Sequence, residues 1–230
     1  MKLIVLAAGL GKRFLPTTNT TPKGMIPILG EPLLKHIVEP YLKYVSDIIF
    51  VINNPLGRQI KEYFKKNYFG HKVVYRIQAE PKGTMDALLV CKDLINENEL
   101  FCVCNGDDLL QEADIKNAIE EKVIGLGISK KIMPKSYLGI KVENECILGF
   151  VRHNTKVNYI EDIFYNGFNI LDKKVFEFQP ISTRDGELGL PQTLFANIDI
   201  YPLKAFAFES WETVNSPKDI ENAKKFIKSL

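Results

Sequence analysis

The sequence has little net charge, no strongly basic or acidic balance and no long hydrophobic run. Its 30 lysine and arginine residues nearly cancel 28 aspartate and glutamate residues, which leaves a formal net charge of +2. This balance gives no reason to expect a nucleic acid or a membrane surface as a partner. The first apolar run, residues 3–10, is too short to span a bilayer and leads into glycines rather than a cleavage site. We therefore expect a cytoplasmic protein.

Cysteine is also scarce. Four cysteines in 230 residues do not make a disulfide scaffold, and none of them has the C-x-x-C spacing of a zinc site. Cys102 and Cys104 alternate with Val103 in a strand-like run, which predicts packed free thiols. The three histidines are scattered, and no Ser/His/Asp or Cys/His constellation is evident. The sequence therefore points away from metal-thiolate and covalent nucleophilic chemistry.

The chain does contain alternating apolar runs and helical patterns. Strands this apolar, separated by helices, predict an α/β fold: a mostly parallel mixed sheet flanked by helices on both faces. No repeat, low-complexity tract or linker is visible, so we expect a single domain over residues 1–230, with an elaborated second half. The expected strands are 3–7, 48–52, 73–77, 100–104, 123–129, 138–142, 147–151, 160–170 and 205–209, and the expected helices are 33–44, 58–66, 84–95, 173–178, 188–197 and 217–227.

A loop rich in glycine and positive charge follows the first predicted strand. Gly9 and Gly11 begin a G-x-G-x-x-G dinucleotide motif, but Phe14 occupies the third glycine position. A P-loop fails as well, because Arg13 stands where Ser or Thr is needed. What remains is a loop whose backbone N–H groups can approach phosphate oxygens, with Arg13 and Lys23 as cationic partners. The alternative is a flexible surface turn with solvated charges.

The whole string is more specific than its parts. G-x-G-x-R, followed by P-K-x-x-x-P from Pro22 to Pro27, resembles the signature of the sugar-1-phosphate nucleotidylyltransferases. The resemblance implies a single Rossmann-like domain, with a nucleotide-binding half at 1–110 and an acceptor-binding half at 111–230, in which this loop wraps the triphosphate of an NTP. It also implies that Arg13 and Lys23 are catalytic, because they neutralise charge as pyrophosphate leaves. The nucleotide-binding residues that it implies in the loop are Leu6, Ala8, Gly9 and Gly11.

A second stretch concerns the base. Gln78-Ala-Glu-Pro-Lys-Gly83-Thr84 resembles the Q-x-x-x-x-G-T segment with which pyrimidine-using relatives hold the base. The Gln amide reads the base edge, and the glycine lets the backbone approach closely. Because an amide can turn, the sequence leaves CTP and UTP open.

Two further stretches resemble the metal site of the family. Asp107, in Asn-Gly-Asp-Asp after the fourth predicted strand, matches the Mg²⁺ ligand, although Gly-Asp-Asp also occurs in plain turns. In the late segment that begins with Trp211, Asn215 takes the place of a second Asp, and an amide oxygen can ligate Mg²⁺. A different alignment register would put Thr213 there. Asn215 could instead be a turn or N-cap residue of the terminal helix.

The resemblance thins where relatives bind the acceptor. Many of them carry a Glu that accepts hydrogen bonds from sugar hydroxyls, whereas the aligned residue here is Arg152, which has no acceptor. We therefore expect a small anionic phosphomonoester, with the CTP:phosphoglutamine cytidylyltransferases of capsule biosynthesis as suggested relatives. Arg152 could equally be a surface arginine. The other predicted acceptor residues are Gly139, Asn169 and Glu187.

The sequence thus predicts a Mg²⁺-dependent nucleotidylyltransferase that uses CTP or UTP and a small phosphorylated acceptor, with homo-oligomers left open. One alternative is a uridylyl- or thymidylyltransferase acting on a sugar 1-phosphate. A glycosyltransferase of similar fold is disfavoured because Asp107 and Asp108 are adjacent and make no D-x-D motif. Another alternative is a catalytically silent nucleotide-sensing subunit, which Asn215 in place of Asp keeps open.

Overall fold

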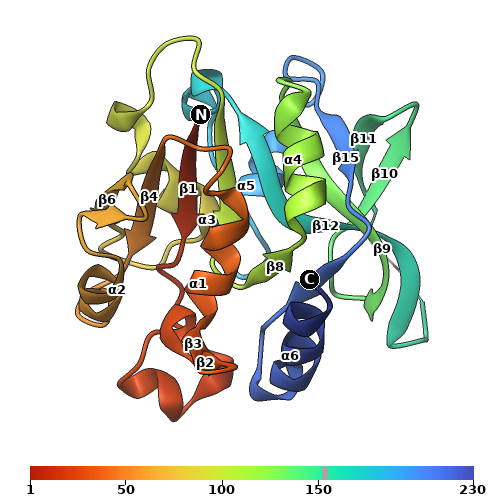
Figure 1. The fold of residues 1–230 in the computed structure, drawn as a ribbon. Coiled ribbons are helices and arrows are strands. Elements are labelled where there is room, and N and C mark those ends of the chain that lie inside the picture. The colour runs from red at the N-terminus through yellow and green to blue at the C-terminus, as the bar shows by residue number, and fades with distance from the viewer. Residues whose placement is uncertain (152–154) are drawn as a thin grey trace.

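A ten-stranded mixed sheet runs through the computed structural model, which describes residues 1–151 and 155–230 (Figure 1). The strands are β1 (Lys2–Leu6), β2 (Pro27–Ile28), β3 (Glu31–Pro32), β4 (Asp47–Ile52), β5 (Asn67–Tyr68), β6 (His71–Ile77), β7 (Phe101–Asn105), β8 (Asp108–Leu110), β9 (Gly125–Pro134), β10 (Gly139–Glu143), β11 (Cys146–Val151), β12 (Tyr159–Leu171), β13 (Ile181–Ser182), β14 (Leu188–Gly189), β15 (Lys204–Ala207) and β16 (Trp211–Thr213). The α-helices are α1 (Leu33–Val38), α2 (Gly57–Phe64), α3 (Thr84–Leu89), α4 (Glu112–Glu120), α5 (Leu190–Ala196) and α6 (Ile220–Ser229).

The first half of the chain builds parallel ladders around β1. This strand pairs in parallel with β4 on one side and with β7 on the other, and β6 continues the sheet beyond β4. The chain therefore leaves β1 in one direction along the sheet and later returns to its other side. Such a reversal of strand order opens a crevice at the carboxyl ends of the strands, which is where α/β sheets of this kind bind ligands.

The second half extends the same sheet with mainly antiparallel ladders. The long strand β12 pairs antiparallel with both β7 and β9, and β10 pairs antiparallel with β11. The ladder between β15 and β9 is parallel. The prediction of a mixed sheet flanked by helices is confirmed. Its mostly parallel character holds for β1, β4, β6 and β7, whereas most of the later ladders are antiparallel, and of these, within the described residues, only β10 with β11 joins consecutive strands of this sheet.

Alternating residues of the central strands fill two cores, one on each face of the sheet. Leu3 and Val5 of β1 point into a core covered by α1, α2, α4 and α6, whereas Ile4 points into a second core covered by α3 and α5 (Figure 1). Because side chains alternate across a strand, both faces of β1 have to be apolar. The continuous apolar runs of the sequence follow from this double covering.

Most predicted elements are present, with differences at their ends. The predicted helix 33–44 is shorter, since α1 ends at Val38 and a 3-10 turn, Glu39–Tyr41, follows it. Helix α4 was not predicted. Cys102 and Cys104 are buried free thiols, as expected. Over the described ranges, no helix has the length and apolar character needed to cross a membrane.

Candidate active site

A cleft of about 550 Å³ opens at the carboxyl ends of β1 and β7, where the strand order reverses. The loop between β1 and β2, residues 7–26, which we call the glycine loop, lines one side of the cleft. The segments that follow β6 and β7 line the other side. All the predicted nucleotide-binding, metal and catalytic residues line this cleft, and Glu187 lines it too. They are Leu6, Ala8, Gly9, Gly11, Arg13, Lys23, Gln78, Gly83, Thr84, Asp107 and Asn215.

The glycine loop is held in one conformation by contacts of its own. Gly11 has a φ of +61°, and a Cβ there would lie 2.9 Å from Cγ2 of Thr18. The Thr18 hydroxyl donates a hydrogen bond of 2.9 Å to the Gly11 carbonyl. At the start of the loop, the Asn53 side chain donates to the Ala8 carbonyl at 2.9 Å. Glycine at position 11 is therefore required both by the left-handed backbone and by the close approach of Thr18.

Two cationic side chains of this loop contact side-chain oxygen atoms on the opposite side of the cleft. The Lys23 Nζ atom lies 2.6 Å from Oδ2 of Asp107, and the two side chains are 14% and 29% exposed. The Arg13 guanidinium donates to Oδ1 of Asn215 at 3.1 Å. The predicted phosphate-binding cations thus contact the predicted metal ligands. A metal–triphosphate complex would place positive charge beside the oxygens and negative charge beside the cations, so it complements both pairs.

Asp107 reaches the cleft because Gly106 brings its segment against β1. The Gly106 N–H donates to the Leu6 carbonyl at 2.9 Å, and a Cβ at this position would lie 2.9 Å from the same oxygen. The Asp107 carbonyl in turn accepts a hydrogen bond of 2.9 Å from Val214. That backbone contact sets the next residue, Asn215, beside Asp107, although the two are far apart in the sequence.

The neighbouring carboxylate, Asp108, has a structural environment. It is 5% exposed and accepts hydrogen bonds of 2.8 Å from the Trp211 indole and from the Asn105 amide. Burial, followed by the charge of Asp107, raises the pKa of Asp108 to about 7. Asp108 therefore ties β8 to β16 beneath the cleft and leaves Asp107 as the carboxylate that faces it.

The donor set fits Mg²⁺. Among the residues that the structure describes, no group of three or more His, Cys, Asp or Glu side chains could hold a metal. Asp107 and Asn215 nevertheless offer two hard oxygen ligands in one cleft, and Mg²⁺ commonly takes its remaining ligands from phosphates and water. Asn215 is not the helix cap, because Ser216 and Asp219 form a capping box there. Thr213 does not line the cleft.

The predicted base segment has a fixed amide. Gln78 is 4% exposed, and its Nε2 donates to the Gly83 carbonyl at 3.0 Å and to Oδ2 of Asp86 at 2.8 Å. Because both partners are acceptors, only the NH₂ end of the amide can face them. The amide oxygen is therefore the end of Gln78 that remains to contact a base. Thr84 accepts a hydrogen bond of 2.9 Å from the Leu190 N–H, so its hydroxyl already has a partner.

Glu187 enters the cleft from a hairpin in the second half of the chain. The strands β13 and β14 form this hairpin, and the Leu188 N–H donates to the Lys82 carbonyl at 2.6 Å. The sequence predicts that Glu187 binds the acceptor from a loop just before the helix expected at 188–197, and in the structure α5 begins at Leu190. Glu187 therefore lies beside the base segment.

The remaining predicted acceptor residues lie elsewhere. Gly139 begins β10 and does not line the cleft. Asn169 is fully buried in β12, where its amide donates to the Val103 carbonyl at 3.2 Å and accepts from the Tyr165 hydroxyl at 3.0 Å. Its side chain is used within the fold. Arg152 lies outside the described residues, so its predicted role stays a prediction.

Sequence reasoning did not assign several residues that shape the cleft. Lys12, Pro81 and Asn105 line it, and each adjoins a predicted site residue or lies within a quoted motif, so their positions carried a signal. Asp86 and Tyr137 hold the amides of Gln78 and Asn215. Tyr137 is 78 residues from Asn215 in the chain, and nothing in its local sequence indicates this contact.

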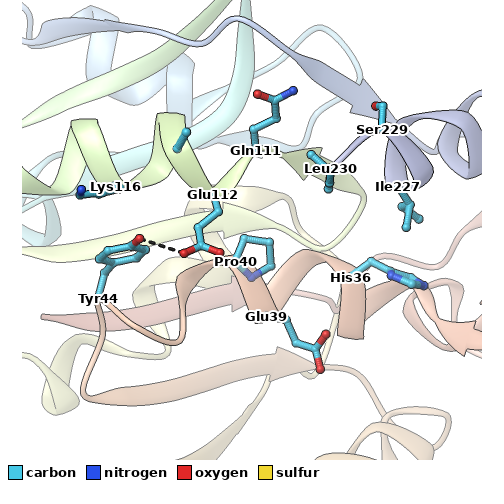
Figure 2. A pocket seen from close by; sticks show the side chains of 11 residues that line it. His36, Glu39, Pro40, Tyr44, Gln111, Glu112, Lys116, Ile227, Ser229 and Leu230 are labelled. Atoms are coloured by element: carbon cyan, nitrogen blue, oxygen red, sulfur yellow. Dashed lines mark hydrogen bonds between the residues drawn. The ribbon is translucent and has the colours of Figure 1, made fainter.

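A second hollow, of about 660 Å³, lies between α1, the start of α4 and the end of α6 (Figure 2). It contains no residue of the glycine loop and none of the predicted site residues. The Glu112 carboxylate accepts a hydrogen bond of 2.9 Å from the Tyr44 hydroxyl (Figure 2), and it also accepts one of 2.8 Å from Lys43. The cleft at the carboxyl ends of the strands is therefore the better candidate site.

Comparison with known proteins agrees with this geometry. The nucleotidyl transferase family matches residues 2–158. The bifunctional protein GlmU of Methanocaldococcus jannaschii is 32% identical over 235 residues, which cover 99% of this chain and 54% of that protein. A UTP–glucose-1-phosphate uridylyltransferase of Streptococcus pyogenes is 35% identical over 141 residues, which cover 51% of this chain and 44% of that protein. The chain thus spans about half the length of the curated relatives it matches.

The fold is also that of solved structures. A UDP-glucose pyrophosphorylase complexed with UDP-glucose superimposes with a TM-score of 0.86 at 22% identity, covering 99% of this chain and 98% of that one. The family match spans more than half of the chain and includes the glycine loop, Lys23, Gln78 and Asp107. The chain belongs to the nucleotidyl transferase family.

Proposed function

We propose that this chain is a Mg²⁺-dependent nucleotidylyltransferase that joins a pyrimidine NTP to a small phosphomonoester and releases pyrophosphate. The observation that carries the proposal is the double pairing in the cleft, Lys23 with Asp107 and Arg13 with Asn215. Cations for a triphosphate and oxygens for its metal meet there beside a glycine loop. In a flexible surface turn with solvated charges, these side chains would point into solvent rather than contact one another across a cleft.

The reaction needs no covalent enzyme intermediate. An oxygen of the acceptor phosphate attacks the α-phosphorus of the NTP in line, a new P–O bond forms, and the bond to the β-phosphate bridging oxygen breaks as pyrophosphate leaves. Arg13 and Lys23 stabilise the negative charge that develops on the phosphates. Asp107 and Asn215 hold Mg²⁺, which when bound supplies Lewis-acid charge at the triphosphate. The glycine loop positions the triphosphate through its backbone N–H groups.

In the proposed function, Gln78 is the residue that contacts the base. With its NH₂ group engaged by Gly83 and Asp86, the amide offers an acceptor oxygen, and a base has to present an N–H to it. Cytosine offers N4–H and uracil offers N3–H, so both pyrimidines qualify. We favour CTP together with a small anionic acceptor such as phosphoglutamine. The reason is that Arg152 stands where relatives carry a Glu for sugar hydroxyls.

The second candidate is a uridylyltransferase for a sugar 1-phosphate. It is favoured by the 35% identity to the Streptococcus pyogenes enzyme, whose name states UTP and glucose 1-phosphate. That identity covers 51% of this chain and 44% of that protein, so it extends over the whole of neither.

The test is pyrophosphate release in the presence of Mg²⁺. CTP, UTP, dTTP, ATP and GTP are each paired with phosphoglutamine, phosphocholine and a panel of sugar 1-phosphates. Turnover with CTP and an anionic non-sugar acceptor supports the proposal in full, whereas turnover with UTP and a sugar 1-phosphate supports the second candidate. The variant Asp107→Asn, measured in parallel, should abolish release if the reaction occurs in this cleft. No release by the wild-type chain with any pair would indicate a nucleotide-sensing subunit instead.

A further inference from the structure

The amide of Asn215 is held at both of its ends. Its Nδ2 donates to the Tyr137 hydroxyl at 2.6 Å and to Oγ1 of Thr213 at 3.0 Å. Its Oδ1 accepts from Arg13 at 3.1 Å. Tyr137 and Thr213 do not line the cleft, whereas Asn215 and Arg13 do. The nitrogen is thus drawn away from the cleft, and the oxygen is turned toward the cation of the glycine loop.

Both partners of the nitrogen are fixed by other contacts. Tyr137 lies in the turn between β9 and β10, where its N–H donates to the Pro134 carbonyl at 2.9 Å and its ring packs edge-on against Trp211 at 6.4 Å. Thr213 ends β16 and pairs with Asp108 of β8. This backbone pairing holds Thr213 in place, and its hydroxyl oxygen accepts from the Asn215 amide at 3.0 Å.

Orientation matters for an amide in a way that it does not for a carboxylate. A carboxylate presents an oxygen whichever way it turns, whereas a turned amide presents N–H groups that repel a cation. An Asn in a position where relatives have Asp can therefore ligate a metal well only if its NH₂ group has acceptors elsewhere. Tyr137 and Thr213 are two such acceptors, one for each N–H.

We propose that Tyr137 and Thr213 are positioning residues, which lock the amide so that Asn215 serves as an oxygen ligand to the divalent cation in place of a carboxylate. The inference rests on the proposed function, because it assigns these residues to the metal site of that function. Partners that orient metal ligands typically contribute about 10- to 100-fold to metal affinity.

The test compares Tyr137→Phe in two backgrounds, the wild-type chain and Asn215→Asp. The Phe ring keeps the packing against Trp211 and loses only the hydroxyl. The dissociation constant of Mn²⁺ is measured by electron paramagnetic resonance with α,β-methylene-CTP, a nucleotide that cannot react. We expect Tyr137→Phe to weaken Mn²⁺ binding about tenfold in the wild-type background. In the Asn215→Asp background we expect a change of less than about twofold, because a carboxylate does not need the lock.

One further variant tests the second acceptor of the amide, and another serves as a control. Thr213→Val, which keeps the shape of the side chain, should weaken Mn²⁺ binding in the same background-dependent way. Tyr44→Phe removes a hydroxyl in the second hollow and should leave Mn²⁺ binding unchanged (Figure 2). Equal weakening by Tyr137→Phe in both backgrounds, or none in either, would overturn the inference while the wild-type chain still binds Mn²⁺ and nucleotide. A wild-type chain that binds neither would overturn the proposed function with it.

Discussion

Lys23 is the residue whose loss should separate catalysis from folding most clearly. Its ammonium contacts Asp107 at 2.6 Å in the cleft, and in the proposed reaction it stabilises the leaving phosphates. We expect Lys23→Ala to lower kcat by about 10²- to 10³-fold, the effect typical of losing one preorganised donor at a developing charge. The melting temperature should fall by only a few degrees, because a single partly exposed ion pair stabilises a domain by about 1 kcal/mol.

The matched control for this prediction is Lys43→Ala. Lys43 also pairs with a carboxylate at 2.8 Å, that of Glu112, but it lies beside the second hollow. Pyrophosphate release and thermal unfolding of both variants check the prediction. A Lys23→Ala variant with nearly wild-type turnover would remove Lys23 from the catalytic residues, whatever its stability.

Asp86 should act on nucleotide affinity through Gln78. Its carboxylate accepts from the Gln78 amide at 2.8 Å and does not itself line the cleft. Asp86→Leu removes one of the two acceptors that hold the amide, so we expect binding of CTP and UTP to weaken by about five- to tenfold, the worth of one hydrogen bond. Asp86→Asn can still accept from Gln78 and should stay close to wild type. Equilibrium titration with each nucleotide measures these affinities. An equal loss of affinity in Asp86→Leu and Asp86→Asn would contradict the proposal that Asp86 orients the Gln78 amide.

Sequence motifs predicted the charged residues of the cleft but not the contacts that hold its two amides. Short motifs placed Arg13, Lys23 and Asp107 together, because each motif states a chemical role at a fixed spacing and the structure lines them along one cleft. The locks on Gln78 and Asn215 were not predictable. They depend on which acceptor lies opposite an amide nitrogen, and for Tyr137 that acceptor comes from a turn 78 residues away.

Among the secondary-structure elements, the hairpin of β13 and β14 completes the base side of the cleft. It docks on Gly83, whose φ is +109° and whose Cβ, if present, would lie 2.4 Å from the Leu188 carbonyl oxygen. We expect Gly83→Ala to displace the hairpin, to lower the unfolding free energy by about 1–3 kcal/mol and to weaken nucleotide binding. Urea unfolding and nucleotide titration measure the two effects.

Gly70→Ala is the control for the hairpin prediction. Gly70 has a φ of +90°, and a Cβ there would have open space around it. Both substitutions therefore impose backbone strain, but only the one at Gly83 adds a collision with backbone. If the two variants lose equal stability and both bind nucleotide normally, the docking of the hairpin does not support the base segment.

Helix α4 is the α-helix that was not predicted from the sequence, alongside short strands such as β8 and β16. Ile115, Ala118 and Ile119 recur at helical spacing and are buried in the core, with Glu112 and Asp114 in the first turn. The signal was therefore present. The strands were easier to predict because a strand covered on both faces is a continuous apolar run, whereas α4 shows its apolar residues on one side only.

The two halves of the whole molecule, residues 1–110 and 111–230, share one sheet. Strand β12 of the second half pairs with β7 of the first half through the register Asn169↔Val103 to Leu171↔Phe101. Each of the two cores also draws on both halves, as with Ile4 and Leu171 on one face of the sheet. The alternation of strands and helices predicted the layers. It did not predict this antiparallel junction, because the pairing of β12 joins strands that are distant in sequence.

This shared sheet leads us to expect that residues 1–230 unfold as one cooperative unit. Separating the halves would expose both cores and leave β7 with an unpaired edge, so neither half should persist alone. Differential scanning calorimetry should show one transition, with a ratio of calorimetric to van't Hoff enthalpy of about 1. Mg²⁺ with CTP should move that whole transition upward, since the ligand binds only the folded cleft. Two transitions, of which nucleotide moves only one, would mean that the halves at 1–110 and 111–230 behave as separate domains despite their common sheet.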